Sequence, residues 1–297
     1  MVDFIFYGLL AGVFFGSGNL ADKYLMANRD ETGMVPTVLS GFLGFVPALT
    51  IFGFTRVPLN LYSAGFAVLG GLFIFGGRYA YFKAMKVGEA SDVSVLGRIN
   101  PLFVFILSII FLGQSFTGAE LIGFSLMFLG GLIVSAKDFD PEKMKFNKAT
   151  VLVIVSVMMY AVTDVLMKVS TENISYLPAY ASALIGALIA SVMISFNSSV
   201  RSSLHSWRDR RFMKLLLPGR VFFYLGFLFF TLALETGKVA LVTASAGIQP
   251  VFVIMAVLGL RKIGWDYFPQ EDMSLKVNII RIASILLFAA GVYILTI

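Results

Sequence analysis

The sequence predicts an all-α membrane protein of ten transmembrane helices, arranged as two inverted five-helix repeats. Three observations predict it: the composition, the number of apolar segments and a motif that occurs twice. Of the 297 residues, 58% are hydrophobic and 13% are charged, and the mean hydropathy is +0.89. A soluble domain of this length covers its core with a polar shell, so this composition indicates a membrane protein.

Ten apolar segments are long enough to cross a bilayer, because a helical span needs about 20 apolar residues. We expect the spans at residues 3–27, 34–54, 62–86, 91–113, 116–136, 149–170, 174–196, 219–236, 240–260 and 275–297. Together they use most of the chain, so no soluble domain of any size is expected.

The third observation is a motif in the fourth segment, Gly-Arg-Ile-Asn-Pro at residues 97–101. It recurs 149 residues later as Ala-Gly-Ile-Gln-Pro at residues 246–250, inside the ninth segment. Pro101 and Pro250 each lack the backbone N–H that would bond the carbonyl four residues back, so each is expected to break its helix. Broken helices at matching places in two halves point to the binding site of a transporter.

The division into halves follows from the repeat. Residues 1–136 are the first predicted repeat, 137–148 a polar cytoplasmic linker and 149–297 the second repeat. Landmarks recur in the same order, since Pro36, Ser40 and Gly44 match Pro178, Ser182 and Gly186. Five is an odd number of spans, so the second repeat enters the membrane from the opposite side. In the first helix, Gly8, Gly12 and Gly16 form a ridge of small residues suited to close helix contact.

The basic residues are expected on one side of the membrane. Ends and loops that follow odd-numbered helices hold 17 Lys or Arg residues, counting Arg220, against three on the opposite side. The positive-inside rule then predicts cytoplasmic basic loops and both termini outside the cell membrane. This distribution accounts for the net charge of +6, so nucleic acid is not an expected partner. In the longest loop, residues 197–220, apolar and basic residues together predict a helix lying on the inner leaflet.

Two arginines lie inside the predicted spans. Arg78 and Arg98 are each about 12 Å deep, taking about 1.5 Å per helical residue. A central Arg costs roughly 2.5 to 3.5 kcal/mol, so each needs a partner or a water-filled cavity. They could bind a substrate carboxylate or phosphate, form an ion pair with Glu89 or Asp92, or reach the membrane interface.

Further polar residues join these arginines as candidates. Ser94 shares a helical face with Arg98, and the amides of the two motifs recur in both halves. The predicted substrate-binding residues are Asn19, Arg78, Tyr79, Tyr81, Ser94, Arg98, Asn100, Tyr224, Thr231 and Gln249. Ordinary helix packing is the alternative for each aromatic residue.

Lys23, Asp164 and Lys168 are predicted to couple transport or to form a charge pair. Asp164 is the candidate for a protonatable or cation-coupling carboxylate, because carboxylates inside a membrane are costly and functional. An i, i+4 pair between Asp164 and Lys168 is the alternative.

The chain resembles the EamA-like family of the drug/metabolite transporter superfamily. The resemblance lies in Gly-Ser-Gly-Asn at residues 16–19 followed by Lys23, in Ala-x-x-x-Gly at 84–88, in Pro101 followed by Phe-Leu-Gly at 111–113, and in the glycine-rich stretch 121–132. Gln114 stands where the family commonly has an acidic residue, and family members usually have cytoplasmic termini. The resemblance implies a secondary carrier for small metabolites, often an exporter, and no catalytic residues.

These observations together predict a secondary active transporter. We expect it to move an amino acid or another organic anion or zwitterion across the cytoplasmic membrane by alternating access, as an exporter or exchanger. The expected partners are the substrate, membrane lipids and a proton or counter-substrate, with the protein a monomer or homodimer. No metal or cofactor is predicted, because the chain has no Cys and its one His lies in a loop. The alternatives are an intramembrane enzyme, a non-transport membrane protein, and a carrier of neutral or cationic drug-like compounds.

Overall fold

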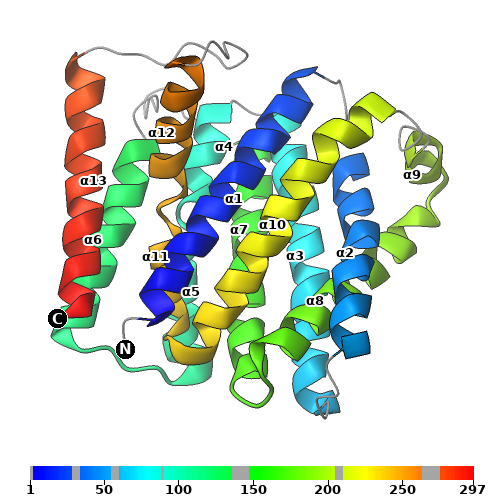
Figure 1. The fold of residues 1–297 in the computed structure, drawn as a ribbon, viewed down its shortest axis with the longest axis horizontal. Helices are drawn as coiled ribbons and strands as arrows, with labels where there is room; N and C mark the ends of the chain where they lie inside the picture. Colours follow the sequence, from blue (N-terminus) through cyan, green and yellow to red (C-terminus); the bar gives the residue numbers. More distant parts are fainter. Residues whose placement is uncertain are drawn as a thin grey trace.

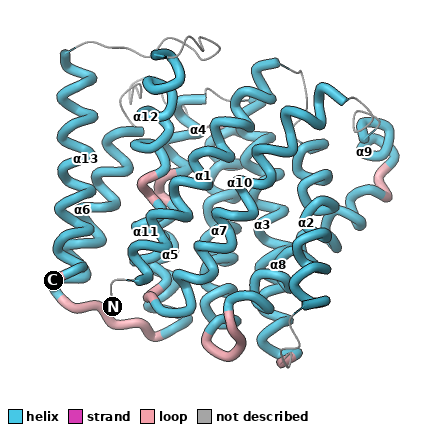
Figure 2. Tube along the Cα trace, in the orientation of Figure 1, coloured by secondary structure: helices cyan, strands magenta, loops and turns pink. Residues whose placement is uncertain are grey.

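The computed structural model describes residues 3–28, 34–54, 60–87, 90–135, 147–204, 210–262 and 275–297. These residues form helices joined by short turns (Figures 1 and 2). The helices are α1 (Asp3–Asn28), α2 (Met34–Phe54), α3 (Leu61–Val87), α4 (Ala90–Gly97), α5 (Asn100–Leu112), α6 (Gly118–Ser135), α7 (Lys148–Thr171), α8 (Tyr176–Ser195), α9 (Ser198–Ser203), α10 (Arg210–Thr236), α11 (Val239–Ala246), α12 (Gln249–Lys262) and α13 (Leu275–Thr296). The described residues supply ten segments long and apolar enough to cross a membrane, which confirms the predicted all-α fold.

The fourth and ninth spans are interrupted, as the two proline motifs predict. Residues 98 and 99 form a turn between α4 and α5, and residues 247 and 248 form a turn between α11 and α12. At both places the backbone bonds run three residues back, from the Arg98 amide to the Val95 carbonyl at 3.0 Å and from the Gly247 amide to the Ala244 carbonyl at 3.0 Å. Each break therefore replaces α-helical bonding with a tight turn.

The glycine ridge of α1 packs on the second break. A Cβ atom on Gly12 would lie 2.7 Å from the Ala246 carbonyl oxygen, the group left without its helical donor by Pro250. Gly8 lies against Ser245 in the same way, and Gly16 lies against Phe252. The ridge thus brings α1 close to α11 and α12, which confirms the helix contact predicted from its spacing.

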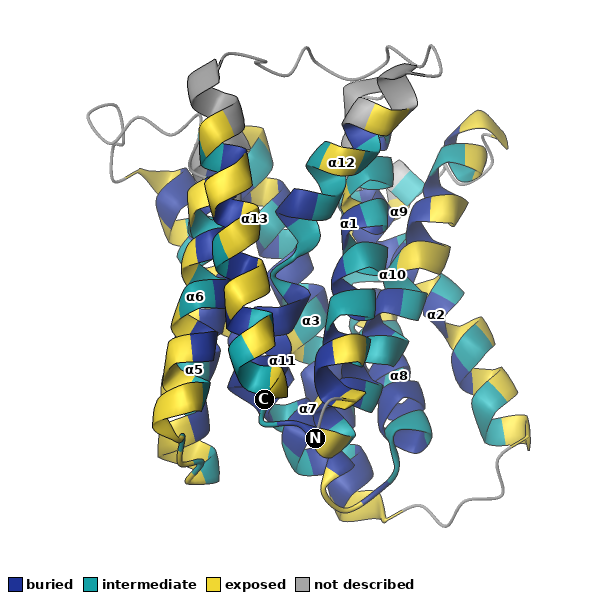
Figure 3. Cartoon of the chain, turned by 60° about the vertical axis from the view of Figure 1, so that its left-hand side comes forward, coloured by how far each residue is buried: buried dark blue, intermediate teal, exposed yellow. Residues whose placement is uncertain are grey.

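Helices of the two halves pack along one another rather than forming separate bundles. In the described structure α1 packs along α10, α3 along α7, and α6 along α13, while α8 contacts both α2 and α3. Both termini lie at the same end of the molecule (Figure 1). The outer faces of α5, α6 and α13 are largely exposed (Figure 3). The exposed residues include the apolar Phe111 and Leu286, as expected of surfaces that contact lipid.

The eighth span is longer than predicted. It begins at Arg210 rather than residue 219, because Phe212 and Leu216 are buried against Leu25 and Val35. The prediction of an interfacial helix over 197–220 is therefore wrong for residues 210–220. Counting Arg220 as a loop charge is also wrong, since it is inside α10 and 1% exposed. Without Arg220, the count made from the sequence for the ends and loops after odd-numbered helices is 16 Lys or Arg residues.

Candidate functional site

At each break, the amide residue before the proline bonds to the first helix of the other half. Asn19 on α1 donates from Nδ2 to Oε1 of Gln249 at 3.2 Å. Asn100 donates from Nδ2 to Oδ2 of Asp164 on α7 at 3.3 Å. Asn100 and Gln249 occupy matching places in the repeated motif, so the two bonds are equivalent contacts between the halves.

The two acceptors, Gln249 Oε1 and Asp164 Oδ2, each accept a second hydrogen bond, and the second donor differs between the two breaks. Arg98 Nη1 donates to Gln249 Oε1 at 3.1 Å. Thr243 Oγ1 donates to Asp164 Oδ2 at 3.2 Å. Among the residues that the structure describes, no Lys or Arg forms an ion pair with Asp164. The break at Pro250 therefore has the guanidinium of Arg98 beside it, and the break at Pro101 has the carboxylate of Asp164.

A second polar cluster lies one turn further along α1, where Asp22 joins two arginines of different helices. Arg78 of α3 donates from Nη2 to Asp22 Oδ2 at 2.6 Å. Arg220 of α10 donates from Nη2 to Asp22 Oδ1, and from Nη1 to the Ser40 hydroxyl of α2 at 2.9 Å. Arg220 is 1% exposed and Arg78 is 7% exposed. Asp22 thus bridges the two arginines with one charge-assisted hydrogen bond to each.

Aromatic rings surround Arg78. Its guanidinium carbon lies 4.6 Å from the centroid of the Phe223 ring and 5.5 Å from that of Phe82. Cation–π contacts of this length stabilise a guanidinium that is removed from water. The ring of Tyr81, one turn beyond Arg78, lies beside the first break, since a Cβ atom on Gly97 would be 3.9 Å from its Cε2 atom.

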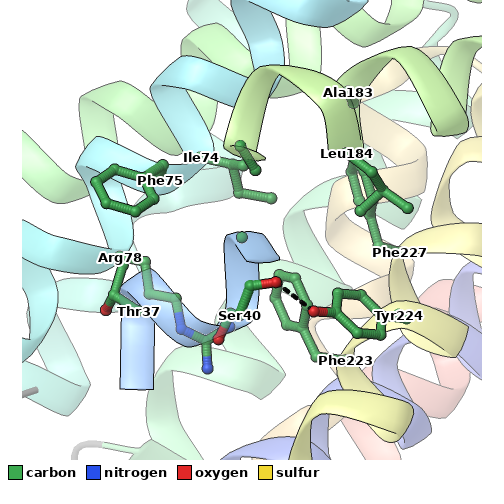
Figure 4. A pocket seen from close by; sticks show the side chains of 12 residues that line it. Thr37, Ser40, Ile74, Phe75, Arg78, Ala183, Leu184, Phe223, Tyr224 and Phe227 are labelled. Carbon is green, nitrogen blue, oxygen red and sulfur yellow. Dashed lines mark hydrogen bonds between the residues drawn. The ribbon is translucent and has the colours of Figure 1, made fainter. Parts of the chain in front are cut away.

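A cavity opens between α2, α3, α8 and α10, beside Arg78. Figure 4 shows Arg78, Ser40 and Tyr224 on one side of it, with apolar side chains around the remainder. The apolar lining comes mainly from Ile74, Phe75, Leu184, Phe223 and Phe227. The Tyr224 hydroxyl donates to the Ser40 carbonyl, so its polar end is held by α2. An apolar cavity with a few convergent polar groups is the usual form of a small-molecule site.

Most of the predicted residues come together in this region. Asn19, Arg98, Asn100, Asp164 and Gln249 meet at the breaks. Arg78 and Tyr224 line the cavity, and the Tyr81 ring lies beside Gly97 at the first break. The side chains of Lys23 and Ser94 lie outside those that the structure describes, as do Glu89 and the side chain of Asp92.

Three predicted residues lie elsewhere. The ring of Tyr79 faces Lys83, whose Nζ is 5.6 Å from its centroid. Thr231 is fully buried and donates to the Phe227 carbonyl of its own helix. The predicted pair between Asp164 and Lys168 is wrong, because Lys168 Nζ donates to the Leu234 carbonyl at 2.9 Å and lies 3.7 Å from Glu172. The hydroxyl of Thr231 and the ammonium of Lys168 are thus engaged away from the breaks.

Sequence reasoning missed Asp22, Arg220, Ser40 and Thr243. Asp22 adjoins Lys23 in the sequence, and of the two only Lys23 has a predicted role. Thr243 lies 149 residues after Ser94, so the repeat itself contained a signal for it. Arg220 looked like the end of a loop, because the charges before it interrupt the apolar run. Within the described part of the chain, no group of three His, Cys, Asp or Glu residues is placed to hold a metal ion.

Ten apolar spans with charged and amide side chains gathered between them define a polytopic membrane protein with an internal polar site. Residues 4–136 match the model of the EamA-like transporter family, which belongs to the drug/metabolite transporter superfamily. This match confirms the resemblance predicted from the sequence: residues 4–136 carry an EamA-like unit, and that family implies a membrane transporter.

A protein of similar sequence and a protein of similar fold are known. An uncharacterized protein of Methanocaldococcus jannaschii is 27% identical over 140 residues, which are 44% of this chain and 95% of that protein. That relative is therefore about as long as one half of this chain. A solved crystal structure, described only as that of a protein, is 15% identical with a TM-score of 0.66, covering 99% of this chain and 96% of the other. At this identity, the likeness concerns the fold alone.

Proposed function

We propose that this protein is a secondary active transporter that moves a small organic anion or zwitterion across the cytoplasmic membrane by alternating access. Two inverted repeats would form the moving parts, with the substrate crossing between them. The observation that carries the proposal is the meeting of both helix breaks with polar residues of the opposite half, through the Asn19–Gln249 and Asn100–Asp164 bonds. The solute would be exported, or exchanged for a second solute.

Equivalent contacts in the two halves support the repeats. A Cβ atom on Gly219 of α10 would lie 3.7 Å from the Gly18 carbonyl oxygen of α1. A Cβ atom on Gly70 of α3 would lie 3.7 Å from the Thr163 carbonyl oxygen of α7. Gly219 follows Gly70 by the same 149 residues that separate the two breaks. In each half, the third membrane span (α3 or α10) thus packs on the first span of the other half (α7 or α1) at a matching glycine.

The charge of Arg98 supports an anionic or zwitterionic substrate. Its guanidinium donates to one amide oxygen, that of Gln249, and remains partly exposed although it lies within a span. An arginine at this depth is costly unless it has partners or a watery cavity. A substrate carboxylate could use the remaining donors of the guanidinium fork.

Counterflow in proteoliposomes tests this proposal. Protein reconstituted with an unlabelled amino or organic acid inside should take up the labelled acid faster than protein in empty vesicles. Arg98→Gln should abolish uptake while the protein remains folded, and Glu120→Gln, at the other end of the molecule, should leave it unchanged. Product formation from the acid in detergent, without trans-stimulation, would favour the enzyme alternative instead.

Asp164 is proposed as the coupling group. It is a buried carboxylate that accepts hydrogen bonds from Asn100 and Thr243 and has no ion pair with a described Lys or Arg. A proton or a counter-substrate could supply the missing positive charge. Asp164→Asn should then abolish accumulation driven by a pH gradient but preserve counterflow, which needs no net driving force. Loss of both activities, or of neither, would remove Asp164 from this role.

The proposed orientation places the basic loops in the cytoplasm and both termini outside. The distribution of 16 basic residues against three supports it. Cysteines introduced singly at positions 2 and 140 test it, since the natural chain has no cysteine. A membrane-impermeant thiol reagent applied to intact cells should label the first and not the second. The reverse pattern would place the termini in the cytoplasm.

A further inference from the structure

We propose that the cavity between α2, α3, α8 and α10 binds an organic monocarboxylate with an apolar body, and that Asp22 is an internal carboxylate which this ligand displaces from Arg78. The inference deepens the proposed function by naming a substrate class. Only the statement that the ligand is also transported rests on that function. Binding is tested without it.

The first argument is charge. The cluster joins two guanidinium groups, on Arg78 and Arg220, to one carboxylate, on Asp22. Both arginines are more than nine-tenths buried, and the Nε–H of each has no hydrogen-bond partner among the described residues. One positive charge in excess and two unused buried donors are costly to keep out of water. A ligand bearing one negative charge would neutralise the cluster.

The second argument is the shape and chemistry of the cavity. Arg78 reaches it from α3, and the Tyr224 hydroxyl and Ser40 lie on the same side (Figure 4). Opposite them the lining is apolar, from Ile74, Phe75, Leu184 and Phe227. Polar groups on one side and apolar groups on the other fit a molecule with a charged head and a hydrophobic body. They do not fit a sugar phosphate, whose hydroxyl groups would face hydrocarbon without partners.

The third argument is the position of Asp22 itself. Its two oxygen atoms are divided between the arginines, Oδ2 accepting from Arg78 and Oδ1 from Arg220. Asp22 therefore links α1 to both α3 and α10. A ligand carboxylate that took the Nη2 donor of Arg78 would break the link from α1 to α3, while Arg220 still held Asp22. Binding in the cavity would thus loosen a contact within the first half and keep the Asp22–Arg220 contact between the halves.

Binding of four small probes to the purified protein tests the proposal. Hexanoate carries both features, acetate lacks the apolar body, hexan-1-ol lacks the charge, and hexylamine carries the opposite charge. Hexanoate should bind by calorimetry and raise the thermal unfolding temperature, with at least about tenfold weaker binding for each of the other three. Equal binding of hexanoate and hexan-1-ol, or of hexanoate and acetate, would overturn the proposal.

Variants locate the site. Arg78→Gln should abolish hexanoate binding, and Asp22→Asn should strengthen it roughly tenfold, because the internal competitor is removed. Glu120→Gln is the matched control, since it neutralises a carboxylate paired with Lys238 at the other end of the molecule. If Asp22→Asn yields no folded protein, Phe227→Ala serves instead, and it should weaken hexanoate binding but not acetate binding. Wild-type affinity in Arg78→Gln would overturn the proposal.

Transport of labelled hexanoate separates this inference from the proposed function. Binding that depends on Arg78 without counterflow would contradict the transporter role and leave the ligand class standing. Counterflow of another organic acid, with no hexanoate binding, would retain the transporter and overturn the inference.

Discussion

The contact of α3 with α8 differs from the contact of α10 with α2, although α3 and α10 hold matching places in the two halves. Between α3 and α8 the backbones touch. A Cβ atom on Gly71 would collide with the Ala183 carbonyl, and one on Gly186 would collide with the Val68 carbonyl. At the place in α10 that matches Gly71, 149 residues on, the chain has Arg220. There the helices are separated by a guanidinium that donates to Ser40.

This difference accounts for the position of the cavity. Glycines allow close approach of membrane helices, so the α3–α8 side is closed. The Arg220 side chain, its partner Asp22 and the cavity occupy the matching space near α2 and α10. In a transporter of two inverted repeats, one closed and one open contact at matching places are expected of a single access state. The opposite state would close α2 on α10 and open α3 from α8.

The largest expected effect on the open side follows from removing the charge that holds it. Asp22→Asn leaves two buried guanidinium groups without a carboxylate, and we expect a loss of about 3 to 5 kcal/mol in the free energy of unfolding. Denaturant unfolding in detergent measures it. Hexanoate should restore part of the loss, and Glu120→Gln provides the control. A loss below 1 kcal/mol would show that Asp22 does not hold the arginines in solution.

On the closed side, Gly71→Leu should cost about 3 kcal/mol, because overpacking a close helix contact forces the backbones apart. Gly65→Ala is the matched control on the same helix, since a Cβ atom there would meet nothing within 4 Å. The control should lie within about 0.5 kcal/mol of the wild type or above it. Equal effects of the two substitutions, measured by thermal unfolding, would mean that α3 and α8 do not touch.

Arg220→Gly places at the α2–α10 contact the residue type that the α3–α8 contact has at the matching position, Gly71. We expect a smaller loss, about 1.5 to 3 kcal/mol, because Asp22 keeps its bond to Arg78 while the bonds to Arg220 are lost. The substitution should also weaken hexanoate binding, since α2 can then approach α10 and reduce the cavity. Unfolding and calorimetric titration measure the two effects. Unchanged affinity would show that Arg220 does not keep these helices apart.

The smallest effect concerns a pair outside the comparison. Glu120 and Lys238 lie 2.7 Å apart, with side chains 21% and 35% exposed. Ion pairs that solvent reaches contribute about 0 to 1 kcal/mol, and this pair is partly exposed, so Glu120→Gln should change stability by no more than that. A larger loss, measured under the same denaturant conditions, would show that the variant is unsuitable as a control.

The sequence predicted the fold because membrane spans are specified locally, by length and hydropathy, and because Pro101 and Pro250 break helices wherever they stand. It also predicted most residues at the breaks, because an amide residue precedes the proline in both copies of the motif, as Asn100 and as Gln249. Partners across the bundle were harder to find. Arg78 bonds to Asp22, 56 residues away on another helix. No periodicity within one helix carries that information.

Arg220 is a second residue whose environment depends on tertiary packing and could not be predicted from its own helix. Its charge and those of Arg210 and Arg211 give that stretch the composition of a loop, while the buried faces of Phe212 and Leu216 make it helix. Burial against Leu25 and Val35 comes from tertiary packing, which the sequence of α10 alone does not contain. The cavity could not be predicted from the sequence either, because its lining residues come from four helices that are distant in the chain.

Distances across the two contacts test the central claim most directly. The natural chain has no cysteine, so spin labels can be placed at two exposed pairs, Phe42 with Val221 for α2 and α10, and Leu69 with Ile189 for α3 and α8. While the reconstituted protein exchanges hexanoate across the bilayer, each pair should show two distances, with the first pair short when the second is long and the reverse. If both distances stay fixed while the protein exchanges hexanoate across the bilayer, the two halves do not alternate and the account is wrong.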